Sequence, residues 1–165
     1  MAQPLDIKEA YGRLFPPVHA KCRRLLGQTQ ASEDVAQEAF VRLWQSGLLE
    51  RDSGIPVVMA WLYRTATRLS IDFLRDRRAW SAPPAPDEAF GCGVDLGTST
   101  EAKRLIAALA ASVPKEELAA AVLCRVDGLS QIEAATVLEI SERTLRRTLS
   151  RFDERTVALR KEFAS

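Results

Sequence analysis

The sequence has few of the residues that hold metals or form disulfides. Its 165 residues include three cysteines and one histidine, and no two cysteines form a Cys-x-x-Cys pair. An odd, dispersed set of cysteines is typical of a reducing compartment rather than of a disulfide framework. His19 and Cys22 lie at helical spacing, but no second pair of ligands completes a metal site. We therefore expect no disulfide framework, no metal and no other cofactor.

Long apolar runs and alternating patterns are also missing. No stretch approaches the roughly 20 apolar residues of a membrane span. The first residues lack the basic segment and apolar run of a secretion signal. These absences predict a cytoplasmic protein without membrane insertion. The apolar residues recur at helical spacing and not in the alternation typical of strands, so the chain is expected to be all-α.

The location of charge says more about partners than its total. The formal net charge is only +1 at pH 7. Residues 1–80 nevertheless hold twelve Lys or Arg against nine Asp or Glu, and residues 140–161 hold seven against three. A local excess of positive charge attracts nucleic acid even when acids elsewhere cancel the sum.

Three helices are predicted within residues 1–80. The first covers about residues 7–26, with Gly27 as its stop and Pro16-Pro17 expected to break or kink it. The second begins with Ser32 as N-cap and ends at Gly47. Its core-facing stripe comprises Val35, Ala36, Ala39, Phe40, Leu43 and Trp44. The third begins near Pro56 and runs to about residue 78, with a core-facing row of Leu62, Ala66, Leu69 and Phe73.

The composition changes abruptly after residue 80. Residues 81–100 hold three prolines, three glycines and many small or acidic residues, which indicates a flexible linker. At about 3.4 Å per residue, such a linker could extend for roughly 70 Å. Helices are predicted beyond it over residues 101–112 and 114–126, followed by a turn at Asp127-Gly128. We therefore expect two small helical domains, residues 1–80 and 101–165, joined by this linker.

Residues 130–152 have the pattern of two short helices around a tight bend. Ser130 and Glu133 form a capping-box pattern, and Ser141 caps the second helix. In that helix one narrow sector is mainly apolar, formed by Leu145, Leu149, Phe152, Thr156, Leu159 and Phe163. Arginines occupy the other side. This arrangement is typical of a helix-turn-helix whose second helix reads DNA, although the arginines alone would also suit a solvated face.

Two segments carry a resemblance to a known family. Residues 32–44 (SEDVAQEAFVRLW) and 60–75 (AWLYRTATRLSIDFLR) resemble sigma region 2. Residues 128–145 (GLSQIEAATVLEISERTL) resemble the helix-turn-helix of sigma region 4. Because both occur in this order across a linker, the chain resembles bacterial RNA polymerase sigma factors of the extracytoplasmic-function (ECF) group.

The resemblance implies three sets of contact residues. The largest polymerase subunit would contact the second helix through Asp34, Gln37, Glu38 and Arg42, whereas Phe40, Leu43 and Trp44 are expected in the core. The loop 47–55 and the third helix would bind and open the −10 promoter element, the latter through Trp61, Arg64, Thr65, Arg68 and Arg75. Trp61 and Tyr63 could equally be core residues. The −35 element would meet Arg143, Thr144, Arg146, Arg147, Ser150 and Arg151.

The resemblance also implies a function and its partners. The chain would be a promoter-specificity subunit and not an enzyme, with core RNA polymerase, promoter DNA and an anti-sigma factor as partners and no small-molecule substrate. Two alternatives remain, a stand-alone helix-turn-helix regulator and a sigma-like decoy that opens no promoter.

Two positions depart from the family pattern. Arg68 stands where the family often has asparagine, which leaves the −10 base preference open. Glu139 stands where the turn usually has glycine. A non-glycine residue at positive φ costs about 1 kcal/mol or more, so the turn is either strained or differently shaped.

Overall fold

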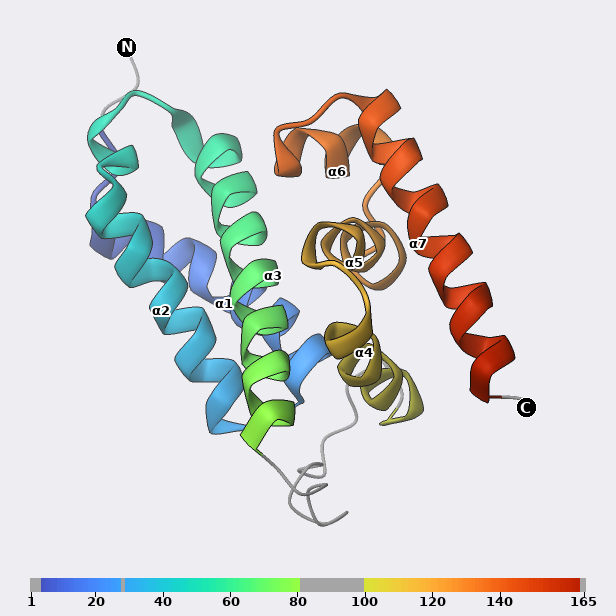
Figure 1. Ribbon diagram of the computed structural model, residues 1–165. Coiled ribbons are helices and arrows are strands. Elements are labelled where there is room, and N and C mark those ends of the chain that lie inside the picture. The colour runs from blue at the N-terminus through green and yellow to red at the C-terminus, as the bar shows by residue number, and fades with distance from the viewer. Residues whose placement is uncertain (1–3, 28, 81–99, 164–165) are drawn as a thin grey trace.

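The computed structural model describes residues 4–27, 29–80 and 100–163 (Figure 1). The N-terminal helices are α1 (Ile7–Leu26), α2 (Gln30–Ser46) and α3 (Gly54–Trp80), with a 3₁₀ turn, η1 (Leu48–Glu50), between α2 and α3. The C-terminal elements are α4 (Thr100–Ser112), α5 (Lys115–Ala121), the π-helical turn η2 (Val122–Val126), α6 (Gln131–Leu138) and α7 (Glu142–Phe163). The described residues contain no strand, which confirms the all-α prediction. The predicted linker lies outside them, up to residue 99.

The sequence predicted that Pro16-Pro17 would break or kink the first helix, and the helix is not broken there. α1 runs from Ile7 to Leu26 with both prolines inside it. Each proline removes one backbone donor from the helix. Leu14, Val18 and Leu25 are buried on the same helix, which packs against α2 and α3. Burial of such a side chain contributes about 1.5–3 kcal/mol, so tertiary packing offsets the lost hydrogen bonds.

The start of α2 also differs from the prediction. The helix begins at Gln30, and Thr29 occupies the N-cap position without a side-chain hydrogen bond. Ser32 is therefore not the N-cap. It is buried inside the first turn, where its hydroxyl donates to the carbonyl oxygen of Thr29 at 2.8 Å. The predicted stops are confirmed, since Gly27 and Gly47 follow α1 and α2 with φ values of 82° and 72°.

The helix-turn-helix forms as the pattern predicts. The Ser130 hydroxyl accepts from the backbone N–H of Glu133 at 3.1 Å, and the Glu133 carboxylate accepts from the N–H of Ser130 at 2.7 Å. Ser141 caps α7 by accepting from the N–H of Thr144 at 3.1 Å. Glu139 lies between the two helices at φ 57° and ψ 41°, the left-handed conformation that favours glycine.

The remaining sequence predictions for α7 and α3 agree with their packing. In the predicted apolar sector of α7, Leu145, Leu149 and Phe152 are buried. Thr156 and Leu159 are half-buried, and the Phe163 side chain lies outside the described part of the structure. In α3, Leu62 and Ala66 are buried, while Leu69 and Phe73 are half-buried against the same core.

α3 lies at the centre of the molecule, between the two groups of helices (Figure 1). On one side it packs against α1 and α2, and on the other against α4, α5 and α6. The sequence does not predict this second set of contacts. It determines how the candidate DNA-binding side chains are arranged.

Candidate nucleic-acid and polymerase interfaces

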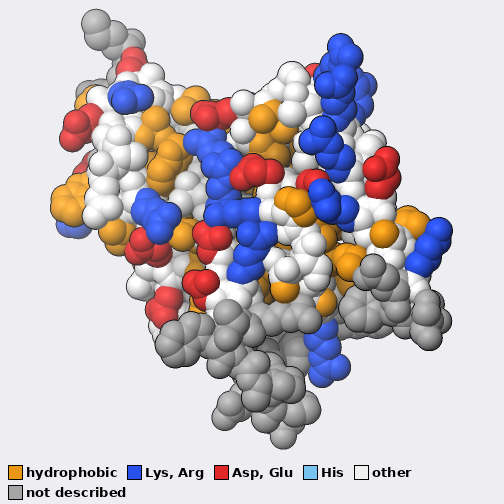
Figure 2. All heavy atoms as spheres, viewed as in Figure 1, with side chains coloured by type: hydrophobic (Ala, Val, Ile, Leu, Met, Phe, Trp, Pro, Cys, Tyr) orange, Lys and Arg blue, Asp and Glu red, His pale blue; other side chains and the backbone are white. Residues whose placement is uncertain are grey.

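The first candidate surface is the solvent face of α7 near its N-terminus. All six side chains predicted to meet the −35 element are exposed there: Arg143, Thr144, Arg146, Arg147, Ser150 and Arg151. None of the four arginines has a side-chain hydrogen bond or an ion pair with any residue that the structure describes. Basic side chains gather along the upper part of α7 (Figure 2). Because Leu145 and Leu149 hold the opposite side in the core, the guanidinium groups point away from the protein.

The second candidate surface is the predicted −10 row of α3. Arg64, Arg68 and Arg75 lie on one side of the helix, as expected, but this side borders the C-terminal helices, which leave the Arg64 side chain 14% and the Arg68 side chain 38% exposed. A column of basic side chains bordered by acidic ones follows the junction (Figure 2). Trp61 and Thr65 are half-buried, and Trp61 packs against the core. The row is therefore formed, but it is partly covered, and its guanidinium groups have partners within the chain.

Tyr63 belongs to the internal packing of the fold. Its ring lies 5.1 Å from the Lys21 ammonium nitrogen, measured to the ring centroid, which is a cation–π distance. The ring also packs half-buried against the hydrophobic core. Of the two readings left open for Tyr63, the structure favours the core residue.

The third candidate surface is the outer face of α2. The four predicted polymerase contacts, Asp34, Gln37, Glu38 and Arg42, are all exposed. They form hydrogen bonds along the helix: Arg42 donates to Glu38 at 3.0 Å, and Gln37 donates to Glu33 at 3.2 Å. These bonds hold the polar side chains in one strip that a partner can reach.

The placement of Trp44 in the core was wrong. Phe40 and Leu43 are buried as predicted, but the Trp44 residue is 67% exposed, and Val41 is exposed next to it. At about 100° per residue, Trp44 falls at the edge of the apolar stripe, in the sector of Gln37 and Val41. A helical projection places Trp44 on this border but does not decide whether a neighbouring helix covers it. The polar strip therefore contains an exposed apolar centre, which sequence reasoning missed.

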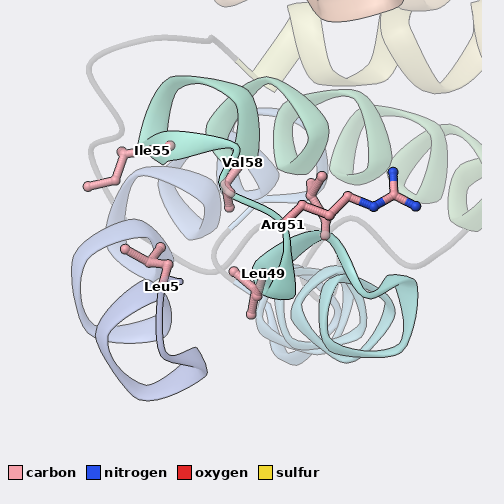
Figure 3. A pocket seen from close by; sticks show the side chains of 7 residues that line it. Leu5, Leu49, Arg51, Ile55 and Val58 are labelled. Atoms are coloured by element: carbon pink, nitrogen blue, oxygen red, sulfur yellow. The ribbon is translucent and has the colours of Figure 1, made fainter. Parts of the chain in front are cut away.

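A small apolar cavity lies beside the loop 47–55. It has a volume of about 340 Å³ and is lined by Leu5, Leu48, Leu49, Arg51, Gly54, Ile55 and Val58. Several of these aliphatic side chains converge on the space between the start of α1, η1 and the start of α3, whereas the Arg51 guanidinium points away (Figure 3). The cavity could hold one small apolar or planar group.

The part of the chain that the structure describes contains no group of three His, Cys, Asp or Glu side chains that could hold a metal. Burial raises the pKa of Cys22 to about 11, so this thiol stays protonated at neutral pH. None of the described helices combines the length and hydropathy needed to cross a membrane.

Comparison with known proteins matches two separate segments of the chain. Residues 10–79 match the family described as Sigma-70 region 2, and residues 112–160 match a homeodomain-like domain. The ECF RNA polymerase sigma factor SigW of Bacillus subtilis strain 168 is 30% identical over 158 residues, which cover 88% of this chain and 82% of SigW. This chain belongs to the ECF sigma factors.

Other relatives of this ECF sigma factor are longer. SigE of Mycolicibacterium smegmatis is 28% identical over 81% of this chain and 53% of its own length. The probable RNA polymerase sigma factor RfaY of Xanthomonas campestris pv. campestris is 28% identical over 87% of this chain, which spans only 38% of RfaY. CnrH, solved in complex with the cytosolic domain of CnrY, shares the fold with a TM-score of 0.50 at 23% identity, over 94% of this chain and 88% of CnrH.

Proposed function

We propose that this ECF sigma factor binds core RNA polymerase and directs transcription initiation at promoters that it recognises through a −10 and a −35 element. The observation that carries the proposal is the exposed group of arginines on α7, held out by a helix-turn-helix in a chain whose first half matches Sigma-70 region 2. No step of this function requires catalysis by the chain itself.

The −35 element is read by α7. An α-helix fits the major groove of B-DNA, and arginine can donate two hydrogen bonds to a guanine edge. Arg143 and Arg147 lie one turn apart on the exposed side, with Arg146 and Arg151 on its flanks. The flanking cations suit phosphate contacts, which position the helix, while the central pair suits base contacts.

The polymerase binds the outer face of α2. Its polar strip of Asp34, Gln37, Glu38 and Arg42 includes the exposed Val41 and borders the exposed Trp44. Tryptophan is enriched among the residues that dominate binding energy at protein interfaces, especially where polar groups form a rim. Trp44 is therefore the apolar anchor of this surface.

The −10 element is bound by the α3 row and the loop 47–55. Arg64, Arg68 and Arg75 supply positive charge for a phosphate backbone, and Trp61 offers a ring for an unpaired base. The apolar cavity beside this loop is lined on one edge by Arg51, a suitable neighbour for an unstacked nucleotide.

Run-off transcription is the direct test. Core polymerase from the source organism, supplied with this protein, should start transcripts at discrete genomic sites that core polymerase alone does not use. Mapping those starts would reveal two upstream elements in common. Absence of any dependent start on a genomic template library would refute the proposed function.

Arg147 gives a residue-level prediction. Arg147→Ala should weaken binding of the polymerase complex to the mapped −35 element by about 1–3 kcal/mol, because one base-reading guanidinium is lost. The matched control is Arg13→Ala, since Arg13 is exposed on α1 and pairs only with Glu9 at 3.3 Å in the described structure. Promoter affinity measured by filter binding should be unchanged in the control. Equal losses of promoter affinity in both variants would show that α7 does not recognise the −35 element.

A stand-alone DNA-binding regulator is the second candidate. The α7 arginines are exposed even while the α3 row is covered, so this surface could bind duplex DNA without polymerase. A gel-shift assay with and without core enzyme distinguishes the two. A sigma-like decoy would bind core enzyme without opening the promoter. In a permanganate footprint, the thymines of the −10 element would then stay unreactive.

An anti-sigma partner and a cytoplasmic location stay predictions of the family resemblance. Affinity purification of the tagged full chain from its own cells, followed by mass spectrometry, tests the first. A sigma inhibitor should compete with core polymerase for the purified chain.

A further inference from the structure

The α3 row is held by the C-terminal helices through a series of polar contacts. Arg68 pairs with Glu116 at 3.1 Å, and Asp72 pairs with Lys115 at 2.8 Å, both at the start of α5. Arg64 lies within 3.2 Å of the Glu139 carboxylate, and its side chain is only 14% exposed. The charges of this row therefore already have partners within the chain.

Two of these arginines cap helices of the other half. Arg75 donates to the carbonyl oxygens of Ala110 and Val113 at 2.6 and 2.7 Å, where α4 ends. Arg64 donates to the carbonyl oxygen of Val137 at 3.1 Å, in the last turn of α6. The last carbonyls of a helix lack partners within it, and the helix dipole favours a cation there. These backbone acceptors stand in for the phosphate oxygens that the same guanidiniums would meet on DNA.

A buried ion cluster fastens the same two halves. Asp127, in the turn before the helix-turn-helix, accepts from Lys21 and from Arg24, the latter at 2.8 Å, near the end of α1. The side chains of Asp127 and Lys21 are both 0% exposed. Removal of one member of such a pair leaves an uncompensated buried charge, so the cluster strongly favours the arrangement in which both halves meet.

The closed arrangement cannot serve both promoter elements at once. Elements named −10 and −35 lie about 25 base pairs apart, which is about 85 Å at 3.4 Å per base pair. Here α3 contacts α6 directly, and α6 contacts α7. The two reading helices are thus separated by little more than one helix, about 10–12 Å in diameter. The C-terminal helices must leave α3 before both elements can be bound.

We propose that the cationic row of α3 has two mutually exclusive partners, the chain's own C-terminal helices and promoter DNA, and that Asp127 is the latch of the closed form. The outer face of α2 and the arginines of α7 stay exposed in this form, so polymerase or duplex DNA can bind before the latch opens. The identification of the DNA as promoter DNA rests on the proposed function. The contacts between the α3 row and the C-terminal helices do not depend on it.

Asp127→Asn in the full chain tests the latch. Its matched control is Asp153→Asn, because Asp153 pairs with Arg125 and both residues lie in the C-terminal half. Small-angle X-ray scattering should show a larger radius of gyration for the Asp127 variant alone. Fluorescence anisotropy with a labelled single-stranded DNA of about 20 nucleotides in mixed sequence should show about tenfold tighter binding at about 50 mM salt.

The salt dependence identifies the row as the source of the gain. Release of three arginines predicts a log–log salt slope steeper by about 2, at about 0.7 per charge on single strands. Affinity for a duplex of the same sequence should change by less than about twofold, since α7 is exposed in both forms. Opening without tighter single-strand binding would overturn the proposal, and so would an unchanged radius of gyration.

A milder variant covers the case in which Asp127→Asn fails to fold, as judged by circular dichroism. Glu116→Gln removes only the exposed pair with Arg68, and Glu9→Gln removes a similarly exposed pair on α1. Single-strand affinity should rise about twofold for Glu116→Gln alone; equal affinities would overturn the proposal. Run-off transcription with the wild-type chain decides the proposed function separately, because these probes need neither polymerase nor a known promoter.

Discussion

At the scale of single residues, Glu139 combines two opposing effects. Its left-handed backbone carries a cost of about 1 kcal/mol for a residue with a Cβ atom. Its carboxylate lies 3.2 Å from Arg64, but the side chain is largely exposed, so the pair contributes only a few tenths of a kcal/mol. Replacement of Glu139 by glycine should therefore gain more free energy from the relaxed backbone than it loses with the ion pair.

Glu139→Gly should raise the free energy of unfolding by about 0.5 kcal/mol, measured by urea denaturation. Glu139→Ala is the matched control, because it loses the same pair and keeps the strained backbone. It should be slightly less stable than wild type. A glycine variant less stable than the alanine variant would contradict the assigned strain.

The capping box at Ser130 predicts a pH-dependent contribution to stability. Hydrogen bonds from Ser130 hold the pKa of Glu133 below its ordinary value of 4.5. A lowered folded pKa means that the contribution is fully present above pH 4.5 and is lost as the pH falls through the folded value.

Ser130→Ala should lower the free energy of unfolding by about 1 kcal/mol at pH 7. The pH-dependent part belongs to the Glu133 carboxylate, which accepts mainly from the backbone N–H that Ser130→Ala keeps. The stability difference between Glu133→Ala and wild type should therefore shrink as the pH falls below 4.5, as measured by denaturant titrations at several pH values. Thr148→Ala is the control, since its hydroxyl donates within α7 and not at a cap. A difference that grows toward acid would contradict the assigned direction.

At the scale of helices, hydrophobic periodicity predicted well where the helices lie in the chain. It predicted less well which side of a helix faces solvent. Helical spacing located every long helix, and the glycine stops after α1 and α2 are confirmed. Helical spacing placed Trp44 in the core because the apolar stripe of α2 is only about two residues wide. Whether a residue at its edge is buried depends on the neighbouring helices. A break at Pro16-Pro17 does not occur, because packing against neighbouring helices, which a local pattern does not contain, keeps α1 continuous.

The two aromatic residues of α2 should separate stability from binding. Trp44→Ala should change the free energy of unfolding by less than about 0.5 kcal/mol, because the side chain is mostly exposed. Phe40→Ala should cost about 3–5 kcal/mol, because Phe40 is buried. In a core-polymerase binding assay, Trp44→Ala should weaken the complex by about 2 kcal/mol. Unchanged polymerase affinity would remove Trp44 from the interface.

At the scale of the whole molecule, the ion cluster around Asp127 connects segments about a hundred residues apart. Burial lowers the pKa of Lys21, and Asp127 opposes that shift. Within the closed fold the buried Lys21 charge depends on Asp127, so the two segments must pair for this arrangement to be stable.

A double-mutant cycle should measure this coupling. Asp127→Asn should lower the free energy of unfolding by about 3 kcal/mol, because Lys21 then lacks its carboxylate partner. Addition of Lys21→Met should recover about half of that loss or more, since no unpaired charge stays fully buried. Urea denaturation of the four proteins gives the coupling energy. Strictly additive losses would show that the two side chains do not depend on each other.

The sequence by itself determined the helices, the helix-turn-helix with its two caps, and the residue types of each candidate surface. These features depend on contacts between neighbours in the chain, such as Ser130 with Glu133, which a local pattern contains. The tertiary structure alone decided that Trp44 faces solvent and that the arginines of α3 face the C-terminal helices. Those outcomes depend on the partner of each surface, and the partners of Arg64, Arg75 and Lys21 come from distant segments that periodicity cannot identify.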